Sequence, residues 1–382
     1  MEAHISKRLI NVKKEKEKVL LLGINIKGKK TLFNLKDSMV ELKELTESAG
    51  AEVINTFTQT LDKHSNTYLG KGKLIEIKEY LNVNQITTVI CDDELTPNQQ
   101  LNLETLLGEK IKVLDRTSLI LDIFASRAIS MEGKLQVELA QHEYLLPRLA
   151  GQWTHLERLG GGIGTRGPGE SQIETDRRLA RNRINQLKTK LEKVKAHRQR
   201  YRSKRKNSGI PTITLTGYTN AGKSTLLNML TRSNVLSEDK LFSTLDPTTR
   251  KVSFKNKSAL ITDTVGFIQK LPTNLIASFR ATLEETLEAD MMMHVIDVTD
   301  RNKTMKVNAV QSLWKDLGLD KKPVVTILNK SDQLDPSADP YSDEQLMDLI
   351  KFLPNPIFCS ATTGLGKKEI LQTLETQIFN RV

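Results

Sequence analysis

The segment Gly217–Ser224, which reads GYTNAGKS, constrains the fold of this chain more than any other part of it. An apolar, strand-like run precedes it at 213–216, and a helix-like run begins at Thr225. In such a strand–loop–helix unit, glycines let backbone amides converge on phosphate oxygens at the helix N-terminus. Lys223 would reach the outer phosphates, and the Ser224 hydroxyl would bind Mg²⁺. An ordinary glycine-rich turn is the alternative, but it does not account for this spacing in this context.

A second motif selects the base. The residues Asn329–Asp332, which read NKSD, follow a buried strand-like run at 324–328. The Asp332 carboxylate can accept two hydrogen bonds from guanine, whereas adenine offers no such pair of donors and would leave the carboxylate unpaired. Asn329 would join this loop to the phosphate loop, and the stem of Lys330 would pack over the base. The motif therefore favours GTP over ATP.

Two further segments supply candidates for contacts with the metal and the γ-phosphate. Asp263 follows a strand-like run and would bind Mg²⁺ through a water molecule, while the amide of Gly266 would contact the γ-phosphate. Between this segment and the phosphate loop, the stretch FSTLDPTT contains three threonines. We assign Thr244 as the metal ligand of a switch that closes when the γ-phosphate is present, with Thr248 and Thr249 as alternatives.

The order of these segments resembles that of a small GTPase of the translation-factor kind. In Ras-like enzymes a glutamine after the D-x-x-G motif orients the attacking water. This chain has Phe267 there, which cannot hydrogen-bond water, so we expect slow intrinsic hydrolysis and a partner that completes the site. Asn220 resembles the asparagine of potassium-stimulated GTPases, which makes K⁺ a candidate cation beside Mg²⁺. The alternative is an amide that only stabilises the loop.

The pair Ser360–Ala361 follows another apolar run and would bring backbone amides to the guanine carbonyl. Together the motifs predict catalytic roles for Lys223, Thr244 and Gly266, and metal contacts from Ser224, Thr244 and, through water, Asp263. The predicted GTP-binding residues are Gly217, Tyr218, Thr219, Asn220, Ala221, Gly222, Lys223, Ser224, Thr225, Phe242, Ser243, Thr244, Leu245, Asp246, Asp263, Thr264, Val265, Gly266, Asn329, Lys330, Asp332, Ser360 and Ala361.

Composition and charge limit the other possibilities. The 382 residues are enough for two or three domains, and the net charge of +11 indicates an acidic partner. The sequence has no recognisable signal peptide or membrane-spanning run, which favours a cytoplasmic protein, with a peripheral membrane fraction as an alternative. Cys91 and Cys359 stand apart beside strand-like runs, which favours buried thiols over a disulfide.

Residues 1–128 are predicted to form a small N-terminal α/β domain. Strand-like and helix-like runs alternate from about residue 19, and Thr96–Pro97 has the N-cap and first-turn proline of a helix. This alternation favours a small parallel sheet flanked by helices. The predicted fold class is therefore α/β: this domain, then an antiparallel helical hairpin, then a P-loop GTPase domain of mostly parallel strands at 209–382.

Residues 129–208 are predicted to form the hairpin. Side chains recur at alternating spacings of four and three residues in two stretches, as in coiled coils. Pro147 would kink the first helix near its end. The two stripes comprise Leu135, Leu139, His142, Leu146 and Leu149, and then Ala180, Ile184, Leu187, Leu191 and Val194.

The hairpin has features expected of an RNA-binding element. Six of the ten residues at 160–169 are glycine, so the backbone could lie against phosphates or bases, although a flexible linker has the same composition. Residues 177–206 form a basic stripe with fourteen Lys or Arg and one acid, Glu192. On an ordinary solvated helix face these positive charges would repel one another, so the stripe favours an RNA partner over a solvated face. The candidate RNA-binding residues are Arg158, Gly162, Gly164, Arg166, Arg177, Arg178, Arg181 and Arg183.

The run Glu138–Leu149, followed by the glycine-rich segment Gly160–Arg178, resembles the HflX family of GTPases. The motifs at Gly217–Ser224, Phe242–Asp246 and Asp263–Phe267 fit the same family, and the resemblance spans nearly the whole chain. It implies the three-part architecture above, binding of GTP or GDP with Mg²⁺, and binding to the RNA of the large ribosomal subunit near the peptidyl transferase centre. It also implies GTP-dependent dissociation of ribosomes, in stress or in the rescue of stalled ribosomes.

We therefore expect a monomeric GTPase, slow alone and stimulated by the ribosome, that dissociates ribosomes. One alternative is a GTPase that assists large-subunit assembly, and another is an RNA-binding or remodelling protein whose affinity GTP regulates. Some family members bind or hydrolyse ATP through the N-terminal region, but no motif here locates such a site. Many carry an additional C-terminal domain, and the residues after Ala361 leave room only for a closing helix.

Overall fold

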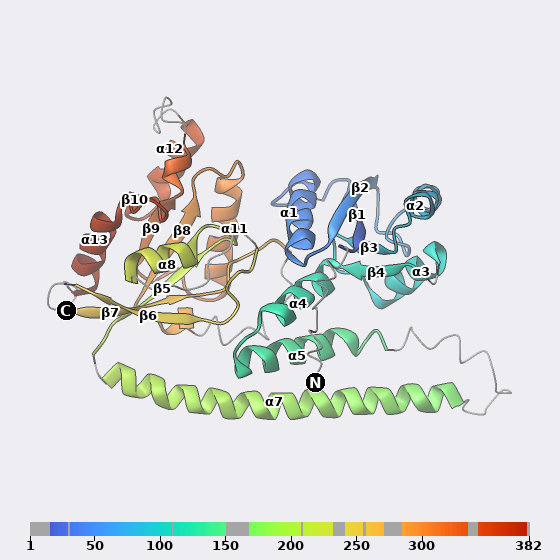
Figure 1. The fold of residues 1–382 in the computed structure, drawn as a ribbon, viewed down its shortest axis with the longest axis horizontal. Coiled ribbons are helices and arrows are strands. Elements are labelled where there is room, and N and C mark those ends of the chain that lie inside the picture. The colour runs from blue at the N-terminus through green and yellow to red at the C-terminus, as the bar shows by residue number, and fades with distance from the viewer. Residues whose placement is uncertain are drawn as a thin grey trace, which may run out of the picture.

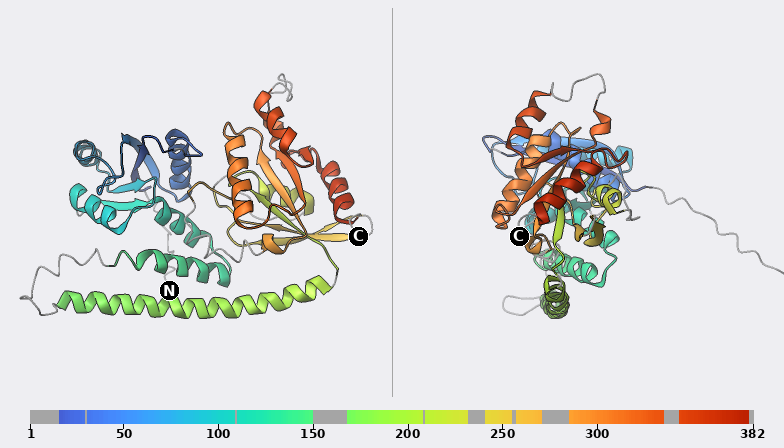
Figure 2. Two further views of the ribbon diagram at one scale, coloured as in Figure 1. Left: turned by 180° about the vertical axis from the view of Figure 1, so that it is seen from behind. Right: turned by 90° about the vertical axis from the view of Figure 1, so that its left-hand side faces the viewer.

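The structure is a computed structural model, which describes residues 16–29, 31–108, 110–149, 168–207, 209–231, 241–254, 257–270, 285–334 and 343–379. Figure 1 shows two α/β units side by side, with a long helix and a shorter partner running below them. Figure 2 shows the same arrangement from behind and from one end. The predicted fold class is confirmed: a small parallel α/β unit, a helical hairpin and a P-loop sheet follow one another along the chain.

The N-terminal unit is a four-stranded parallel sheet in the order β2-β1-β3-β4. Alternate side chains of its long inner strand point to opposite faces: Leu21 joins the core on one face, and Leu20 and Leu22 join the core on the other. Helices α1 (Leu35–Ser48) and α4 (Arg116–Arg127) cover the first face, and α2 (Lys71–Asn84) and α3 (Pro97–Leu107) cover the second. The strands are β1 (Lys18–Ile26), β2 (Glu52–Leu61), β3 (Thr88–Cys91) and β4 (Lys112–Asp115).

Side-chain caps set several helix boundaries in this unit. Helix α3 begins after Thr96, which forms a capping box with Gln99, as the sequence predicts. Helix α1 begins at Leu35, after Asn34, whose side chain accepts a hydrogen bond from the Asp37 amide at 2.8 Å. The thiols of Cys91 and Cys359 are free and buried, which confirms the prediction for both.

The hairpin consists of α5 (Met131–Leu145) and the 40-residue helix α7 (Pro168–Asn207), which lie side by side and run in opposite directions (Figure 1). Two details differ from the sequence prediction. Helix α5 ends at Leu145, so Pro147 lies beyond it and does not kink it. Helix α7 already begins at Pro168, inside the predicted loop, because proline fits the first turn of a helix. The apolar contact between the helices contains Leu135, Leu139, Ile184 and Leu187, with Leu146, Leu191 and Val194 at its margin.

The C-terminal unit is a six-stranded sheet in the order β10-β9-β8-β5-β7-β6, in which only β6 is antiparallel to its neighbour. Helices α8 (Lys223–Thr231) and α13 (Lys367–Phe379) cover one face, and α11 (Lys303–Asp316) and α12 (Glu344–Phe352) cover the other. Carboxyl ends of parallel strands share one edge of a sheet, so the loops after β5, β7 and β9 lie together. The strands are β5 (Thr212–Gly217), β6 (Thr248–Ser253), β7 (Ser258–Asp263), β8 (Met291–Asp297), β9 (Val324–Asn329) and β10 (Pro356–Phe358).

Candidate nucleotide and RNA sites

The phosphate loop joins β5 to α8 and encloses the side chain of Lys223. This side chain is 7% exposed, and its ammonium donates a hydrogen bond of 2.7 Å to the carbonyl of Tyr218. Burial lowers the pKa of Lys223 to about 8, against the opposing effect of Asp263. The buried ammonium of Lys223 is thus bonded to the backbone of its own loop. A bound phosphate group would replace the Tyr218 carbonyl as its partner.

The three predicted metal contacts come together beside this loop. The hydroxyls of Ser224 and Thr244 are 2.7 Å apart, and they donate to Oδ2 of Asp263 at 2.6 and 3.0 Å. Burial raises the pKa of the Asp263 carboxyl. Within the described residues its other oxygen, Oδ1, is buried and has no hydrogen-bond partner. Three hard oxygen groups, one of them with an unsatisfied buried oxygen, fit a Mg²⁺ ion.

The two alternative threonines lie elsewhere. Thr249 belongs to β6, and its hydroxyl bonds to that of Thr262 at 2.9 Å across the strand pair. Thr248 is the first residue of the same strand. Among the three, the structure brings Thr244 to Ser224 and Asp263.

Gly266 lies directly against the phosphate loop. A Cβ at this position would come within 2.7 Å of both the Lys223 ammonium and the Thr219 Cα, so a larger residue would displace the loop. The next residue, Phe267, is bonded to the loop on both sides: its carbonyl accepts from the Thr219 amide at 2.8 Å, and its amide donates to the Gly217 carbonyl at 3.1 Å. The Phe267 ring is buried in an apolar cluster that includes Phe33 of the N-terminal unit.

The end of β9 is tied to the phosphate loop as predicted for Asn329. Its amide nitrogen donates to the Ala221 carbonyl at 2.9 Å, and its amide oxygen accepts from the Ala361 amide at 3.0 Å. Lys330 adopts a left-handed conformation with φ 64°, and its ammonium lies 2.7 Å from Asp297. The segment Asn329–Asp332 and the segment after β10 therefore lie next to each other and line the same cavity.

These segments surround a cavity of about 380 Å³. The cavity is also lined by Gln333 and Thr362, which sequence reasoning missed although each directly follows a predicted motif. Eight predicted residues are absent from its wall: Gly217, Tyr218, Ala221, Leu245, Asp246, Asp263, Val265 and Ser360. Fifteen predicted residues line it: Thr219, Asn220, Gly222, Lys223, Ser224, Thr225, Phe242, Ser243, Thr244, Thr264, Gly266, Asn329, Lys330, Asp332 and Ala361.

Several of these eight residues have side chains that face other parts of the molecule. Leu245 is buried in the core between the N-terminal sheet and α5, and Val265 packs against the same core. The Ser360 hydroxyl bonds to that of Thr362 at 3.0 Å and is fully buried. The carboxylate of Asp246 lies on the N-terminus of α5, not in the cavity. These side chains therefore hold the loops in place and do not form the wall of the site.

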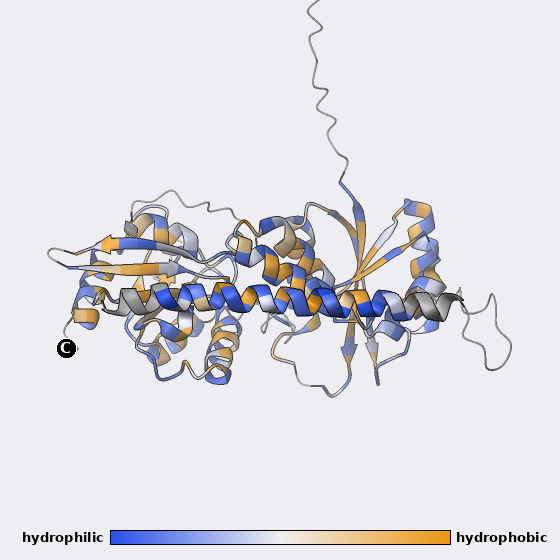
Figure 3. Ribbon diagram, turned by 90° about the horizontal axis from the view of Figure 1, so that it is seen from below, coloured by the Kyte–Doolittle hydropathy of each residue, from blue (hydrophilic) through white to orange (hydrophobic). Residues whose placement is uncertain are grey.

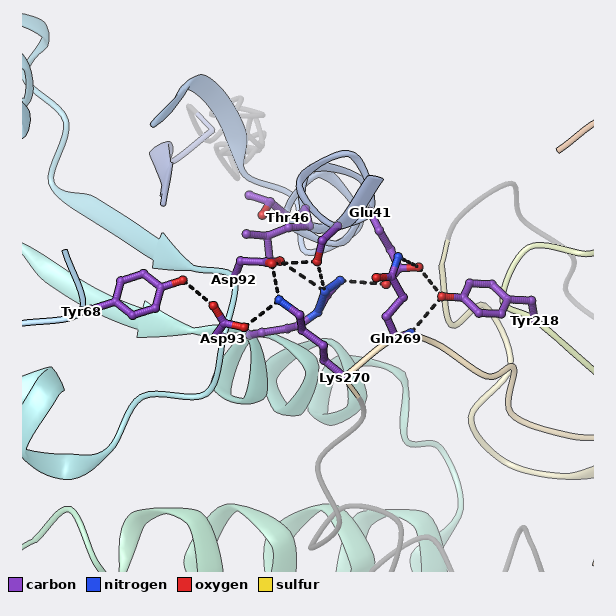
Figure 4. A network of polar contacts seen from close by, with 11 residues as sticks. Glu41, Thr46, Tyr68, Asp92, Asp93, Tyr218, Gln269 and Lys270 are labelled. Carbon is purple, nitrogen blue, oxygen red and sulfur yellow. Dashed lines mark hydrogen bonds and ion pairs between the residues drawn. The ribbon is translucent and has the colours of Figure 1, made fainter. Parts of the chain in front are cut away.

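Tyr218 belongs to a buried polar network between the two α/β units (Figure 4). Its hydroxyl donates to Glu41 at 2.5 Å and accepts from the Gln269 amide at 2.9 Å. Burial and the neighbouring Glu41 raise the pKa of Tyr218, so this hydroxyl keeps its proton. One residue further, the ammonium of Lys270 contacts Asp92 and lies 2.7 Å from Asp93. The segment after Gly266 is therefore anchored to the N-terminal unit, which the sequence motifs did not indicate.

The basic surface of the hairpin is only partly described. Figure 3 shows α7 lengthwise, with mostly hydrophilic residues along the side that faces the viewer. Arg178 and Arg181 are exposed and Arg177 is partly exposed. The guanidinium of Arg183 instead pairs with Glu138 of α5, with Nε 2.7 Å from the carboxylate, so it helps to hold the hairpin together. Four other candidates, Arg158, Gly162, Gly164 and Arg166, lie outside the described residues.

Family models match three consecutive stretches of the chain. A GTP-binding GTPase N-terminal model matches residues 36–125, a GTP-binding GTPase middle-region model matches 127–205, and a model described as 50S ribosome-binding GTPase matches 212–330. A crystal structure of SsGBP in complex with GDP superposes with a TM-score of 0.52 at 27% identity, covering 94% of this chain and 99% of that one. Within the described residues, no helix is both long and apolar enough to cross a lipid bilayer.

Curated relatives match over most of the chain. GTPase HflX of Lacrimispora saccharolytica is 46% identical over 378 residues, which is 98% of this chain and 86% of the relative. GTPase HflX of Escherichia coli is 42% identical over 348 residues, 91% of this chain and 80% of the relative. With identity at this level over such coverage, and with the phosphate loop, metal contacts and base-side loop assembled around one cavity, the chain belongs to the HflX family of GTPases.

Proposed function

We propose that this GTPase binds the large ribosomal subunit and dissociates ribosomes in a GTP-dependent way. The observation that carries the proposal is the position of the two segments that flank the γ-phosphate side of the cavity. The segment around Thr244 contacts the start of the hairpin through Asp246, and the segment after Gly266 contacts the N-terminal unit through Lys270. A change of nucleotide at the cavity would therefore act directly on the hairpin, which bears the basic surface, and on the N-terminal unit.

The cavity residues have distinct tasks in this proposal. The amides of Gly217–Ser224 and the Lys223 ammonium bind the phosphates, and Asp332 with Lys330 binds guanine. Ser224 and Thr244 would hold Mg²⁺ directly, and Asp263 would hold it through water. When bound, Mg²⁺ neutralises charge on the β- and γ-phosphates.

Hydrolysis needs a group that orients the attacking water, and the two candidate side chains that the structure describes after Gly266 do not supply it. Phe267 carries no polar side-chain atom, and Gln269 is engaged with Glu41 at 3.2 Å. We therefore propose slow hydrolysis by the free protein and stimulation by the large subunit, which would complete the site. Asn220, which lines the cavity in a left-handed conformation with φ 60°, would hold K⁺ against the phosphates.

RNA binding is assigned to the exposed face of α7. Arg178 and Arg181 lie on this face. Reversing both charges should weaken binding to the large subunit and lower the salt dependence, with the slope of log affinity against log salt reduced by about 2. The matched control reverses Arg250 and Lys251, two exposed cations on β6. If the two double variants bind the large subunit with equal affinity at several salt concentrations, the basic stripe is only a solvated surface and does not bind RNA.

The deciding measurement is GTP turnover by the purified protein, with and without large subunits, in K⁺ and in Na⁺ buffer. We expect stimulation by subunits of at least about tenfold, and faster turnover in K⁺. Ribosome dissociation is followed in parallel on sucrose gradients, with Ser224→Asn as the variant that disrupts the metal contact. Splitting that survives in Ser224→Asn would exclude a GTP-driven mechanism. Stimulation by immature particles but not by mature subunits would favour a role in large-subunit assembly.

A further inference from the structure

Asp246 lies two residues beyond Thr244, yet its carboxylate contacts a distant part of the chain. One oxygen accepts hydrogen bonds from the amides of Ile129 and Ser130 at 2.8 and 2.7 Å, and the other bonds to the Ser130 hydroxyl at 2.5 Å. These donors precede the first residue of α5, where the helix dipole also favours a negative charge. Three charge-assisted contacts to one carboxylate make a specific and strong attachment.

The helix is shaped to receive this carboxylate. Ser130 is the N-cap of α5, and its hydroxyl accepts from the Gly133 amide at 2.9 Å while contacting Asp246. A Cβ at Gly133 would lie 2.3 Å from Oδ1 of Asp246, which no real pair of atoms tolerates. The carboxylate therefore occupies the space that a side chain at position 133 would need.

The residue on the other side of Thr244 is also fixed to the rest of the molecule. Phe242 adopts a left-handed conformation with φ 57°, and its ring packs edge-on against Phe124 of α4, with 4.6 Å between ring centroids. Between these two anchors, the Thr244 hydroxyl reaches Ser224 and Asp263. The position of Thr244 at the metal contacts is thus determined from both sides by helices α4 and α5.

We infer that Asp246 is a positioning residue for GTP hydrolysis: it holds Thr244 at the metal contacts by fixing the loop to the N-terminus of α5. The position of the hairpin and the closed state of the loop that contains Thr244 are then coupled in a single equilibrium. GTP, which needs Thr244 in place, stabilises the Asp246–Ser130 contact, and by thermodynamic reciprocity whatever stabilises that contact strengthens binding of GTP. The effect on intrinsic turnover needs only the GTPase activity, while its use by the ribosome rests on the proposed function.

A capping role alone would have a different signature. Removing a cap destabilises the helix whatever nucleotide is bound, so it lowers the melting temperature and affects GDP and GTP alike. A positioning role acts only when the γ-phosphate recruits Thr244. The comparison between GDP and a GTP analogue therefore separates the two roles.

The experiment uses the full chain with Asp246→Ala and Asp246→Asn, and with Gly133→Ala as a variant that displaces the carboxylate from the helix side. Gly72→Ala is the control, because this helical glycine has nothing within 4 Å of an added Cβ. We expect affinity for GDP to stay within about twofold, while affinity for the β,γ-imido analogue of GTP and single-turnover kcat each fall about tenfold in Asp246→Ala and Gly133→Ala. Asp246→Asn keeps one acceptor oxygen but loses the charge and replaces the other oxygen by a donor, so it should lie between them and the wild type.

Hydrogen exchange supplies the second readout. In the wild type and in Gly72→Ala, amides at 129–134 should exchange more slowly with the GTP analogue than with GDP, and this difference should vanish in Asp246→Ala. Equal losses of GDP and GTP-analogue affinity, or a difference in exchange that persists in Asp246→Ala, would overturn the inference. Absent stimulation of the wild type by large subunits would instead count against the proposed function, since intrinsic turnover still reports on Asp246.

Discussion

The two sheets use the same edge in opposite ways. In the C-terminal sheet, the carboxyl ends of β5, β7 and β9 border an open cavity of about 380 Å³. In the N-terminal sheet, acidic residues stand at the corresponding edge: Asp92 after β3 and Asp115 at the end of β4. Those carboxylates are already occupied, by Arg116 and Arg148 and by backbone amides. The carboxyl edge of parallel strands therefore forms a ligand site in one unit and an internally neutralised edge in the other.

The difference lies in what fills the polar edge. The C-terminal edge offers donors and an unsatisfied oxygen of Asp263, which suit phosphate and Mg²⁺. The N-terminal edge offers carboxylates, and it receives the Lys270 ammonium from the segment that follows Gly266 (Figure 4). The N-terminal sheet thus binds a part of the GTPase unit where many α/β proteins bind a small molecule.

The largest expected effect tests whether the N-terminal edge is structural. Arg116 is 1% exposed and pairs with Glu41 at 2.7 Å and Asp92 at 3.3 Å. Arg116→Ala would leave both carboxylates buried without this cation, so we expect a loss of about 3–5 kcal/mol in the free energy of unfolding. Urea denaturation measures it, with exposed Lys71→Ala as the control. A loss equal to that of the control would mean that the edge is not held by its ion pairs.

The second test concerns the open edge. Asp332→Asn replaces the acceptor predicted for guanine by a group that can also donate, so affinity for GTP should fall about 100-fold and affinity for XTP should rise. Fluorescent-nucleotide titration measures both, with Asp320→Asn at an exposed loop as the matched control. Unchanged preference for GTP would remove Asp332 from the base site.

Acid should distinguish the sheets further, because the central strand β8 contains His294 and no strand of the N-terminal sheet contains histidine. Burial, followed by the charge of Lys223, lowers the pKa of His294 from 6.5 to about 3. Above pH 6.5, His294 is neutral in both the folded and the unfolded chain, so it does not affect stability. Below pH 6.5, the unfolded chain binds a proton at His294 that the folded chain does not. Stability should therefore fall by about 1.4 kcal/mol per pH unit as the pH drops from 6.5 toward 3.

His294→Phe removes this titration and keeps a ring against Trp314, whose centroid lies 4.8 Å from that of His294. Urea unfolding at pH 7.5, 6.5 and 5.5 should give parallel profiles for the two proteins above pH 6.5 and a steeper decline for the wild type below it. Profiles that stay parallel throughout would show that His294 is protonated in the folded protein.

The smallest effect on the free energy of unfolding is expected for Lys270, which links the C-terminal unit to the carboxyl edge of the N-terminal sheet. Lys270 is partly exposed, and Asp92 keeps its contacts with Arg116 and Ser38 without it, so Lys270→Ala should cost about 1 kcal/mol or less. Hydrogen exchange of the residues around Gln269 should nevertheless increase, because their attachment to the N-terminal unit is weakened. Exposed Lys251→Ala on β6 is the control. A stability loss as large as that of Arg116→Ala would mean that Lys270 is as important as Arg116 for neutralising the N-terminal edge.

Sequence alone predicted the features that depend on neighbouring residues. The alternation of strands and helices, the capping box at Thr96 and the phosphate loop each have a local pattern, and all were located correctly. The contacts between units had no such pattern. Asp246 meets Ser130 across 116 residues, and Tyr218 meets Glu41 across 177, so nothing near either residue indicated its partner. The predicted end of the glycine-rich loop was wrong, because the surrounding glycines concealed the signal of Pro168 as a first-turn proline of α7.

The continuity of α7 has a mechanical consequence. Forty residues of helix span roughly 60 Å, and the chain passes from Asn207 to the start of β5 at Thr212, in the strand that carries the phosphate loop. Because α7 is stiff and packs along α5, the hairpin would tilt as one lever about the end that leads to β5. Tilting its base by about 5° would move the far tip by roughly 5 Å, so an adjustment too small to disturb the packing around the nucleotide would become a displacement the size of a base at the other end.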